Sequence, residues 1–398
     1  MNEFKKLGIA DCVLKSIEEQ GFEEPTEIQR KAIPLILAGK DVIAGSATGS
    51  GKTLAFASII IQDVKKGEEI QSLVLTPTRE LAEQITNTLR MFSKYKPVKI
   101  IPIYGGVSIN PQIENLKVAN IVVGTPGRML DHIRRGTIDL SKVKILVLDE
   151  ADRMLDMGFL EDVESIISQC PRDRQTLLFS ATITHDVLLI TDRYMRNPLK
   201  ISAEEYVDPT KLKQVYYDVP DNMKFSLLVH ILKEEDSNLV MVFCNTRRTV
   251  DFVANNLKLS GINAVAIHGG FSQEKRNHVM HSFNSKKTKV LVCTDVAARG
   301  LDIQDVSHIY NYDVPSESKQ YIHRIGRTAR AGKEGKAITL LSVRDHDNFR
   351  RILRNNEVSI EKEEVPRVER VKVKWRENPR DFRARRSFGN HYKWKRKF

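Results

Sequence analysis

The residues best suited to chemistry form a glycine-rich segment, Ser46-Ala47-Thr48-Gly49-Ser50-Gly51-Lys52-Thr53, which follows an apolar run and opens a helical pattern. Backbone N–H groups in such a loop surround phosphate oxygens, and the N-terminus of the following helix strengthens their attraction. Lys52 would reach the β- and γ-phosphates of a nucleotide, and the Thr53 hydroxyl would hold Mg²⁺. The general pattern has Gly where Ser46 stands, so the match is incomplete, but the strand–loop–helix context favours a nucleotide site over a Gly-rich turn.

A second candidate site is the acidic segment Asp149-Glu150-Ala151-Asp152, which follows the apolar run Lys144–Leu148. Asp149 could hold Mg²⁺, usually through water, and Glu150 could orient or deprotonate an attacking water molecule. A single carboxylate at this point is also typical of an acidic helix N-terminus, which the helix dipole favours. An apolar strand that ends in Asp-Glu about a hundred residues after a phosphate loop favours the nucleotide site.

Short apolar runs that alternate with helical patterns must position these two segments. The runs in the first half are Asp41–Ala44, Ser72–Leu75, Asn120–Val123, Lys144–Leu148 and Thr176–Phe179, and those in the second half are Leu239–Phe243, Ala264–Ile267, Lys289–Val292, His308–Tyr310 and Ala337–Leu341. Between them, residues such as Leu81, Ile85 and Leu89 are spaced for one helix face. Strands buried on both faces with helices between them predict an α/β fold with parallel sheets.

The two sets of runs predict two α/β domains, at residues 1–203 and 213–366, joined by a polar linker at 204–212. Residues 367–398 form a tail with 13 Lys/Arg and 3 Asp/Glu, a net charge of +10, and it contains both tryptophans. Residues 1–366 carry only +2 of the total charge of +12. Because open α/β sheets bind ligands beyond the carboxyl ends of their strands, we expect the two domains to flank one cleft.

The composition excludes some classes of protein. With 398 residues, 41% hydrophobic and 29% charged, the chain can bury large cores, which excludes wholesale disorder. No apolar run reaches the roughly 18–20 residues of a membrane span, and no signal peptide is visible. The four cysteines form no CxxC pair, which favours buried thiols over a disulfide framework or a zinc site. We therefore expect a cytoplasmic protein, although a basic tail can also direct a protein to a nucleus.

The letters DEAD at 149–152, with the phosphate loop before them, resemble the DEAD-box ATP-dependent RNA helicases of superfamily 2. The resemblance runs from about Phe4 to about Ser342 with the family's motifs in order, and it implies two RecA-like domains around an ATP cleft. Two departures are Ser46-Ala47, where Ala-Gln is usual, and Ala329, where Gly is common. Neither departure removes a catalytic group, so the resemblance implies an active enzyme that uses ATP and Mg²⁺.

Residues near the N-terminus resemble the family's adenine-binding Q motif, and they are Phe4, Gly21, Phe22, Pro25, Thr26 and Gln29. The resemblance implies that Gln29 hydrogen-bonds the adenine edge and that Phe22 packs on the base. An amide suits this role because it donates and accepts hydrogen bonds together. Outside this context, a lone Gln near a Phe is an ordinary surface residue. The resemblance also places Asp302 against the ribose of ATP.

Other segments resemble the family's RNA-backbone motifs. In the first domain they are Pro77, Thr78, Arg79, Gly105, Gly106, Thr125, Pro126, Gly127 and Arg128, and in the second domain they are Asn245, Thr246, His268, Gly269, Gly270, Gln273, Arg276 and Thr294. Hydroxyls, glycine amides and arginines suit contacts with phosphate and sugar, which position a strand without reading its sequence. Taken singly, such residues are typical of turns and helix caps.

Two further motifs imply that the ATP and RNA sites are coupled. The tripeptide Ser180-Ala181-Thr182 resembles the motif that hydrogen-bonds the DEAD segment and links ATP to unwinding. By the same resemblance, Arg327 and Arg330 would reach the γ-phosphate as arginine fingers, and His323 and Arg324 would couple that contact to the DEAD segment. Arginines three residues apart can also share one helix face as surface ion-pair partners.

The resemblance implies a monomeric RNA-dependent ATPase that unwinds short RNA duplexes by closing its two domains, with little sequence specificity. Of three alternatives, a DNA translocase and an ATP-dependent RNA clamp or assembly scaffold with little unwinding stay open, whereas the set Lys52, Asp149, Glu150 and Arg327 disfavours a nucleotide-free binding module. The tail mixes Arg and Lys with aromatic side chains, which predicts a largely disordered arm that tethers RNA. A solubilising or partner-docking tail is the alternative reading of the same charge.

Overall fold

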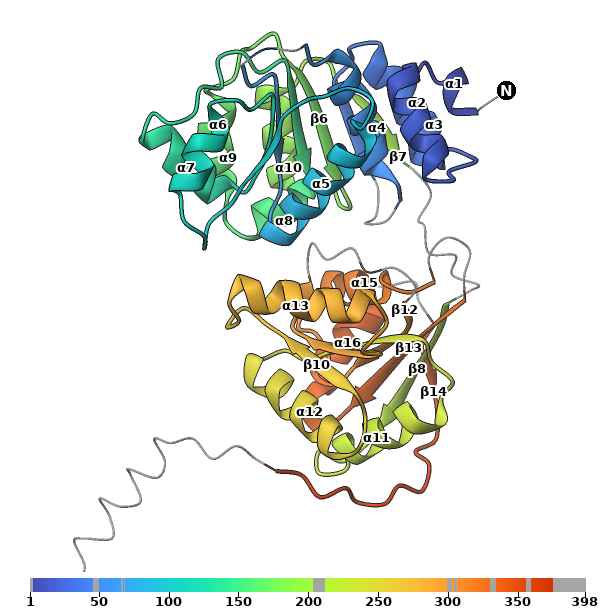
Figure 1. Cartoon of the computed structure of the whole chain (residues 1–398). Coiled ribbons are helices and arrows are strands. Elements are labelled where there is room, and N and C mark those ends of the chain that lie inside the picture. Colours follow the sequence, from blue (N-terminus) through green and yellow to red (C-terminus); the bar gives the residue numbers. More distant parts are fainter. Residues whose placement is uncertain are drawn as a thin grey trace, which may run out of the picture. The chain divides into compact units, whose positions relative to one another are not determined.

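The computed structural model describes residues 3–45, 50–65, 67, 69–202, 212–298, 303, 306–329, 334–355 and 359–374. The chain folds into two compact units, each built on one parallel sheet (Figure 1). We call the unit that contains the first sheet domain 1 and the unit that contains the second sheet domain 2. The predicted α/β class with two parallel-sheet domains is confirmed.

Domain 1 contains, in the described part of the chain, a seven-stranded sheet of order β3-β4-β2-β5-β6-β1-β7. Its strands are β1 (Val42–Gly45), β2 (Ser72–Leu75), β3 (Ile100–Ile103), β4 (Ile121–Gly124), β5 (Ile145–Asp149), β6 (Gln175–Ser180) and β7 (Leu199–Ser202). Its helices are α1 (Glu3–Lys6), α2 (Asp11–Glu19), α3 (Glu27–Leu37), α4 (Lys52–Asp63), α5 (Arg79–Phe92), α6 (Asn110–Leu116), α7 (Pro126–Arg134), α8 (Ala151–Asp156), α9 (Leu160–Ile167) and α10 (His185–Tyr194). All neighbouring strands are parallel, so the loops that follow them lie at one edge of the sheet.

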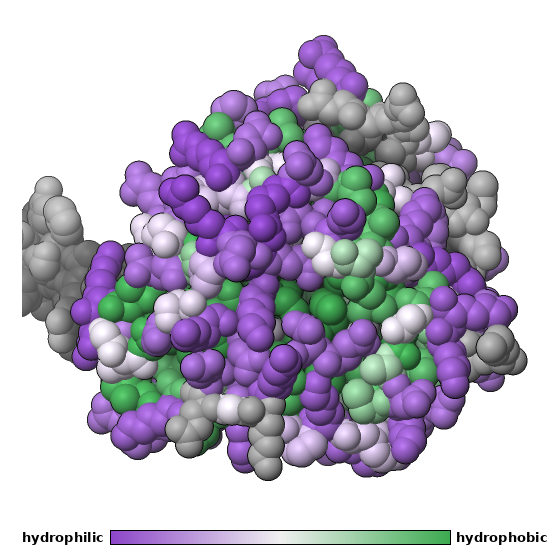
Figure 2. Space-filling model, turned by 90° about the horizontal axis from the view of Figure 1, so that it is seen from above, coloured by the Kyte–Doolittle hydropathy of each residue, from purple (hydrophilic) through white to green (hydrophobic). Residues whose placement is uncertain are grey.

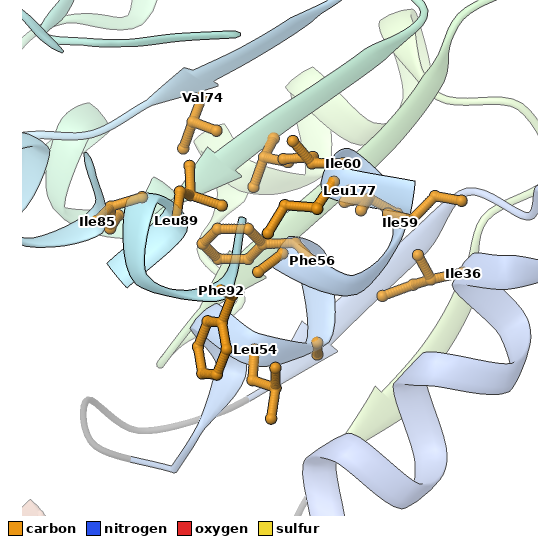
Figure 3. Packing of buried hydrophobic residues seen from close by; sticks show 14 of the residues in the cluster. Ile36, Leu54, Phe56, Ile59, Ile60, Val74, Ile85, Leu89, Phe92 and Leu177 are labelled. Atoms are coloured by element: carbon orange, nitrogen blue, oxygen red, sulfur yellow. The ribbon is translucent and has the colours of Figure 1, made fainter. Parts of the chain in front are cut away.

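Alternate residues of the central strands of domain 1 face two separate hydrophobic clusters on opposite sides of the sheet. Val42 of β1 belongs to the cluster covered by α2 to α5, whereas its neighbour Ile43 belongs to the cluster covered by α7 to α10. In the first cluster, Phe56 of α4 lies beside Leu177 of β6 (Figure 3). This packing holds α4 against the sheet, and because α4 begins at Lys52, it also fixes the end of the phosphate loop.

Domain 2 contains, in its described residues, a seven-stranded parallel sheet of order β10-β11-β9-β12-β13-β8-β14. Its strands are β8 (Leu212–Asp218), β9 (Leu239–Phe243), β10 (Ala264–Ile267), β11 (Val290–Cys293), β12 (Val306–Asn311), β13 (Gly335–Leu341) and β14 (Glu361–Lys362). Its helices are α11 (Lys224–Glu234), α12 (Arg247–Leu259), α13 (Gln273–Asn284), α14 (Asp295–Ala298), α15 (Ser318–Ile325) and α16 (His346–Asn355), with a 3-10 helix at Val343–Asp345.

The two sheets share one strand order, because each strand of domain 2 holds the place of the strand numbered seven lower in domain 1. The strands β9, β10 and β11 therefore correspond to β2, β3 and β4. The helices that follow also correspond, since α5 after β2 is capped by Thr78 and α12 after β9 is capped by Thr246. In each case the threonine oxygen accepts a hydrogen bond from the third N–H of the helix. Equivalent loops in the two domains can thus be compared directly.

Each of the ten predicted apolar runs forms a strand, with ends that shift by at most two residues. The sequence analysis missed β3, β7, β8 and β14. Strand β3 contains Pro102 and lies at an edge of its sheet, where a missing N–H donor is tolerated. Strand β7 is largely exposed. Strand β8 begins at Leu212, which the sequence analysis assigned to the linker, and the exposed Lys213 and Asp218 interrupt its apolar pattern.

Residues 361–374, which we call the strap, run in an extended path across domain 2 after its last helix (Figure 1). The strap begins as β14, which pairs with β8, and the following Glu363 accepts hydrogen bonds from Lys213 and Tyr217. Further along, Val368 and Val371 pack against the hydrophobic cluster of domain 2. The strap is therefore attached to domain 2 both at the sheet edge and on the core.

The end of the strap is held by a buried amide. Asn256 of α12 is 1% exposed, and its side chain accepts from Lys374 N at 2.7 Å and donates to Lys374 O at 3.0 Å. The sequence analysis begins the tail at residue 367, but Val371 N donates to Ser226 Oγ and the backbone of Lys374 bonds to Asn256, so these residues are attached to domain 2. Residues 375–398, which keep nine Lys/Arg and two Asp/Glu, lie outside the described residues.

Two truncations test whether the strap is part of domain 2. Deleting 375–398 is expected to leave thermal unfolding near that of the full chain, whereas deleting 367–398 should destabilise domain 2 by about 2 kcal/mol. The larger deletion exposes the apolar surface under Val371 and removes the two hydrogen bonds of the Asn256 amide to Lys374. Thermal melting of both truncations measures the difference. Equal melting temperatures would contradict a structural role for the strap.

Figure 2 shows one face of the molecule, on which hydrophilic residues predominate and hydrophobic ones appear in smaller areas between them. In the part of the chain that the structure describes, no helix has the length and apolar character needed to cross a bilayer. All four cysteines lie in this part and none forms a disulfide, and Cys170, Cys244 and Cys293 are buried. Burial raises the pKa of the Cys170 thiol to about 11, which makes it a poor nucleophile.

Candidate functional site

The phosphate loop and the N-terminal Q-motif residues contact each other in domain 1. Gln29 of α3 is 5% exposed, and its Nε2 donates to Gly51 O at 2.9 Å while its Oε1 accepts from Thr26 N at 2.9 Å. The Thr26 hydroxyl donates to Ser50 O at 2.8 Å. Gly51 has a φ of 87°, and a Cβ there would lie 2.5 Å from Gln29 Nε2, so the position requires glycine. Ser46 to Gly49 of the loop lie outside the described residues.

The aromatic residues predicted at the base lie in different surroundings. Phe22 is 48% exposed, and its ring centroid lies 6.3 Å from that of Phe92, so much of the ring is open to a ligand. Phe4, in contrast, is 1% exposed within the core of domain 1, and Pro25 is also buried. The structure therefore places Phe4 and Pro25 as supports of the N-terminal helices, with only Phe22 on the surface.

Replacing Gln29 with Ala is expected to weaken ATP binding about fivefold and to reduce the preference for ATP over GTP. The substitution removes the amide proposed to hydrogen-bond adenine. It also removes the hydrogen bonds of Gln29 to Gly51 O and Thr26 N. Titration of both nucleotides against the wild type and Gln29→Ala measures the two effects. The exposed Gln20→Ala serves as a matched control. An unchanged ratio of ATP to GTP affinity would show that Gln29 reads no base.

A buried ion pair joins the phosphate loop to the acidic segment. Lys52 Nζ lies 2.9 Å from Asp149 Oδ1, and the two residues are 5% and 0% exposed. Burial raises the pKa of the Asp149 carboxyl, while the charge of Lys52 acts in the opposite direction. The other carboxylate oxygen, Asp149 Oδ2, is buried and has no hydrogen-bond partner among the described residues. An unpaired buried carboxylate oxygen is costly, so it marks a place prepared for a ligand or a cation.

Glu150 follows directly in an unusual backbone conformation. Its φ of 52° is in the left-handed region, which non-glycine residues rarely adopt outside functional sites. The side chain is 3% exposed, and Oε2 accepts a hydrogen bond from Arg153 Nη1 at 2.8 Å. Its backbone N–H donates to Asp149 Oδ1 at 3.0 Å. The carboxylate that the sequence assigned to water activation is thus held by Arg153, which the sequence analysis did not single out.

The third carboxylate, Asp152, is bound by the segment Ser180–Thr182 at the end of β6. Asp152 Oδ2 accepts from Thr182 N at 3.0 Å and from Thr182 Oγ1 at 2.7 Å, and Asp152 N donates to Ser180 Oγ at 3.3 Å. These contacts join the loops after β5 and β6. They provide a physical link between the acidic segment and Ser180–Thr182, while the role of that link in coupling stays a prediction.

The predicted RNA-contact loops of domain 1 meet around two arginines. A Cβ on Gly106, whose φ is 80°, would lie 1.8 Å from Arg79 Nη1, so the guanidinium crosses the turn directly over the glycine. A Cβ on Gly105 would lie 3.6 Å from Arg79 Nη2 and 4.0 Å from Arg128 Nη2. Thr78 caps α5, and Pro126 opens α7 next to Thr125 and the exposed Gly127. The structure thus brings two cations to one glycine turn, an arrangement that suits a phosphate.

Domain 2 repeats this arrangement with a residue that the sequence analysis missed. A Cβ on Gly269 would lie 3.2 Å from Arg247 Nη2, so Arg247 stands at the Gly269–Gly270 turn as Arg79 stands at Gly105–Gly106. Arg247 is exposed and is the first residue of α12, as Arg79 is of α5. His268 accepts from Gly270 N through Nδ1 and contacts Asp251 through Nε2. The repeated strand order is the signal that identifies Arg247.

Other predicted RNA contacts in domain 2 form structural bonds. Gln273 begins α13 and donates to Asn277, and Arg276 Nη2 lies 3.5 Å from Ala297 O. Thr294 is buried, and its hydroxyl accepts from Ala297 N. Their contacts with a nucleic acid stay predictions.

Arg324 forms the centre of a buried network in domain 2. It is 1% exposed, and its five N–H groups all have acceptors in this domain. Two bonds go to Asp295 at 2.6 and 2.7 Å, and the others go to Asn311, to Asp313 O and to Asn245 Oδ1. Arg324 thus holds together the loops after β9, β11 and β12. Arg324 thereby positions the Asn245 and Thr294–Asp295 loops, while its coupling to the DEAD segment stays a prediction.

Arg327, one of the two predicted arginine fingers, lies just beyond the end of α15. Helix α15 ends at Ile325, so Arg327 follows it in a turn and does not share a helix face with Arg324 as the spacing allowed. Arg327 is 3% exposed, and His323 is half-buried in the last turn of α15. Arg330 and Asp302 lie outside the described residues.

In domain 1, Lys52 of the phosphate loop contacts Asp149 at the end of β5, and the buried Glu150 follows directly. Domain 2 has the same strand order as domain 1. This is the arrangement of a nucleotide-hydrolysing enzyme with two tandem α/β domains. The DEAD/DEAH box helicase family matches residues 26–190, and the helicase conserved C-terminal domain matches residues 223–332. The chain belongs to the DEAD/DEAH box helicase family, and its two domains are RecA-like.

Individual relatives agree with this assignment. The chain is 46% identical to the DEAD-box ATP-dependent RNA helicase CshA of Geobacillus kaustophilus over 93% of the chain and 80% of that protein. It is also 46% identical to the ATP-dependent RNA helicase CshA of Limosilactobacillus reuteri over 88% of the chain and 71% of that protein. Among solved structures, S. cerevisiae Dbp5 bound to RNA and ADP BeF3 aligns with a TM-score of 0.83 and 32% identity, covering 92% of this chain and 96% of that one.

Proposed function

We propose that this protein is an RNA-dependent ATPase that binds single-stranded RNA and locally unwinds short RNA duplexes when ATP closes its two domains. The observation that carries the proposal is the buried Lys52–Asp149–Glu150 cluster, with one carboxylate oxygen unpaired, at the ends of parallel strands. Most buried polar atoms have hydrogen-bond partners, so an unpaired carboxylate oxygen beside the phosphate loop supports a site for a ligand or a cation. The names of the relatives above, which are ATP-dependent RNA helicases, support the choice of ATP and RNA.

ATP would bind domain 1 beside Gln29 and the phosphate loop, which are joined by a hydrogen bond. Gln29 and the exposed ring of Phe22 would meet the base, and Lys52 would leave Asp149 to contact the β- and γ-phosphates. The residues present fit Mg²⁺, because Asp149 Oδ2 is unpaired and Thr53 stands beside Lys52 in the first turn of α4. When bound, the cation would neutralise charge on the phosphate oxygens.

Hydrolysis would use residues from both domains. Glu150, oriented by Arg153, would position the attacking water and take its proton. Arg327 and Arg330 would stabilise the charge that develops on the γ-phosphate, and Asp302 would contact the ribose. Because one domain holds the lysine and the other the arginines, turnover would require closure, and RNA would favour the closed state. Ser180–Thr182, bonded to Asp152, would transmit the state of the ATP site to the loops nearby.

RNA would lie across the glycine turns of the two domains. Arg79 and Arg128 in domain 1 and Arg247 in domain 2 would contact phosphates, together with the N-terminal amides of α5 and α12. Contacts with the backbone position a strand without reading bases, so little sequence specificity is expected. The Dbp5 structure named above was solved with RNA, which supports this use of the fold. We further propose that the protein acts as a monomer in the cytoplasm.

A duplex-release assay tests the proposal. A short fluorescent RNA duplex with a single-stranded overhang should separate repeatedly in the presence of the protein and ATP. With a non-hydrolysable ATP analogue, no catalytic separation is expected, because the protein cannot turn over. Stable capture of RNA with the analogue but no duplex release with ATP would favour an RNA clamp. Equal release of a DNA duplex would favour a DNA translocase. Either result would overturn the unwinding proposal.

The basic residues after the strap are proposed to tether RNA. Deleting 375–398 should weaken RNA binding and flatten its dependence on salt, because up to nine Lys/Arg no longer release counterions. The deletion keeps the strap, so the fold of domain 2 serves as its own control. Measuring RNA affinity at several salt concentrations separates the two outcomes, since a solubilising or partner-docking tail would leave the slope unchanged.

A further inference from the structure

One buried amide joins three segments of domain 1 that carry the proposed RNA contacts. Gln112 of α6 is 7% exposed, and its Nε2 donates to Tyr104 O at 3.0 Å. Its Oε1 accepts from Arg128 Nη1 at 3.1 Å and lies 3.1 Å from His132 Nε2. The residues come from the β3–α6 loop, from α6 and from α7. No motif in the sequence singles out Gln112 or His132, and the proposed function assigns them no role.

The amide orients the guanidinium of Arg128. While Nη1 is held by Gln112, Nη2 donates to Val107 O at 3.0 Å, and Nε lies 3.7 Å from Asp131 Oδ2. These contacts hold the side chain against the Gly105–Val107 turn, beside which the Arg79 guanidinium also lies. A guanidinium already fixed in place loses less conformational entropy when it meets a phosphate than a free side chain would. Fixed geometry therefore increases affinity without adding a contact.

His132 sets the orientation of this amide. The imidazole is fully buried, with Nδ1 2.8 Å from Thr137 Oγ1 and Nε2 3.1 Å from Gln112 Oε1. Burial, and then the charge of Arg128, lower the pKa of His132, so the ring is neutral at neutral pH. Because the amide oxygen Gln112 Oε1 can only accept, His132 Nε2 is the donor of the neutral ring, and Nδ1 accepts from the Thr137 hydroxyl, which also lies 3.2 Å from His132 O. Gln112 Oε1 then accepts hydrogen bonds from both His132 and Arg128, and Gln112 Nε2 donates to Tyr104 O.

We propose that Gln112 and His132 are positioning residues that hold the guanidinium of Arg128 and the Gly105–Val107 turn in place for one RNA phosphate. The inference rests on the proposed function, since it assumes that Arg128 meets RNA. Neither residue touches the nucleotide site, because Gln112 bonds only to Tyr104, Arg128 and His132 among the described residues. Their effect is therefore confined to RNA binding.

Substitution of Gln112 by Met tests the proposal, because Met keeps the volume and removes both hydrogen-bonding groups. Gln112→Met is expected to weaken single-stranded RNA binding about fivefold and to lower the slope of log affinity against log salt by up to one. Arg128→Ala should weaken binding about tenfold with a similar loss of slope. The double variant should lose no more than Arg128→Ala alone, because both act through the same guanidinium. Affinity for a fluorescent ATP analogue should stay unchanged in all three.

The controls separate a positioning role from a general loss of structure. Gln169→Met changes an exposed glutamine between α9 and β6 and should bind RNA as the wild type does. If Gln112→Met does not fold, Gln112→Glu keeps acceptors for Arg128 and His132, and it should still lower the salt slope because a carboxylate neutralises Arg128. A wild-type slope in both Gln112 variants, additive losses in the double variant, or an equal loss of nucleotide affinity would each overturn the inference.

RNA binding by the wild type and the variants distinguishes a wrong positioning role from a wrong proposed function. If the wild type binds no RNA, the proposed function is wrong and the inference falls with it. If the wild type binds RNA with salt dependence and Arg128→Ala weakens it, while Gln112→Met does not, only the positioning role is wrong.

Discussion

Replacing Glu150 with Gln is expected to lower ATP hydrolysis by about 10²–10⁴-fold while leaving ATP and RNA binding near wild-type values. The Glu150 carboxylate, next to Asp149, is the group that we propose takes a proton from water, and Gln keeps its shape without its basicity. Because Arg153 bonds to Oε2, the amide oxygen of Gln can still accept that hydrogen bond. The substitution therefore removes chemistry while preserving the left-handed turn at position 150.

Steady-state ATPase with saturating RNA, together with nucleotide and RNA titrations, measures this effect. Glu161→Gln, at an exposed position in the first turn of α9, is the matched control and should hydrolyse ATP normally. Wild-type turnover in Glu150→Gln would show that another group activates the water, and the assignment of the site would have to be abandoned.

Arg327→Ala is expected to lower RNA-stimulated hydrolysis by about 10³-fold or more, as loss of an arginine finger does in related phosphoryl-transfer enzymes. Lys at this position should restore little, because a point charge does not reproduce a planar guanidinium that bridges two oxygens. ATP binding should persist, since Lys52, Gln29 and the phosphate loop belong to domain 1.

This variant separates the finger from its neighbour Arg324. Arg324 is bonded through all five N–H groups within domain 2, so its loss should disturb the loops after β9, β11 and β12. Thermal melting of Arg327→Ala shows whether a loss of hydrolysis in that variant reflects a loss of fold. Arg350→Ala, at an exposed position in α16, is a control for the loss of one positive charge. Hydrolysis near the wild-type rate in Arg327→Ala would show that Arg327 is not an arginine finger.

The parallel sheets could be predicted because their central strands are buried on both faces and therefore appear as continuous apolar runs. Edge strands do not share this property. Pro102 interrupts β3, and β14 covers only Glu361 and Lys362, whose pairing with β8 depends on the tertiary structure. The strap could not be predicted for the same reason, since the sequence around Lys374 does not indicate that Asn256 lies beside it.

The site could be predicted where spacing along the chain carries the chemistry, as in the phosphate loop and the acidic segment. Their ion pair, Lys52–Asp149, confirms that the two segments meet in domain 1. Residues that act through space could not be found in this way. Arg153, Gln112 and Arg247 stand among ordinary polar positions, and only the fold brings them to Glu150, Arg128 and Gly269. The catalytic and RNA-binding roles themselves stay predictions.

The most direct test of the central claim is the rate of ATP hydrolysis with no nucleic acid, with single-stranded RNA, and with DNA of the same sequence. If ATP and RNA together close the two domains, hydrolysis should be slow alone, strongly stimulated by RNA and little affected by DNA. Equal stimulation by DNA, or rapid turnover without any nucleic acid, would contradict an RNA-dependent closure of the two domains.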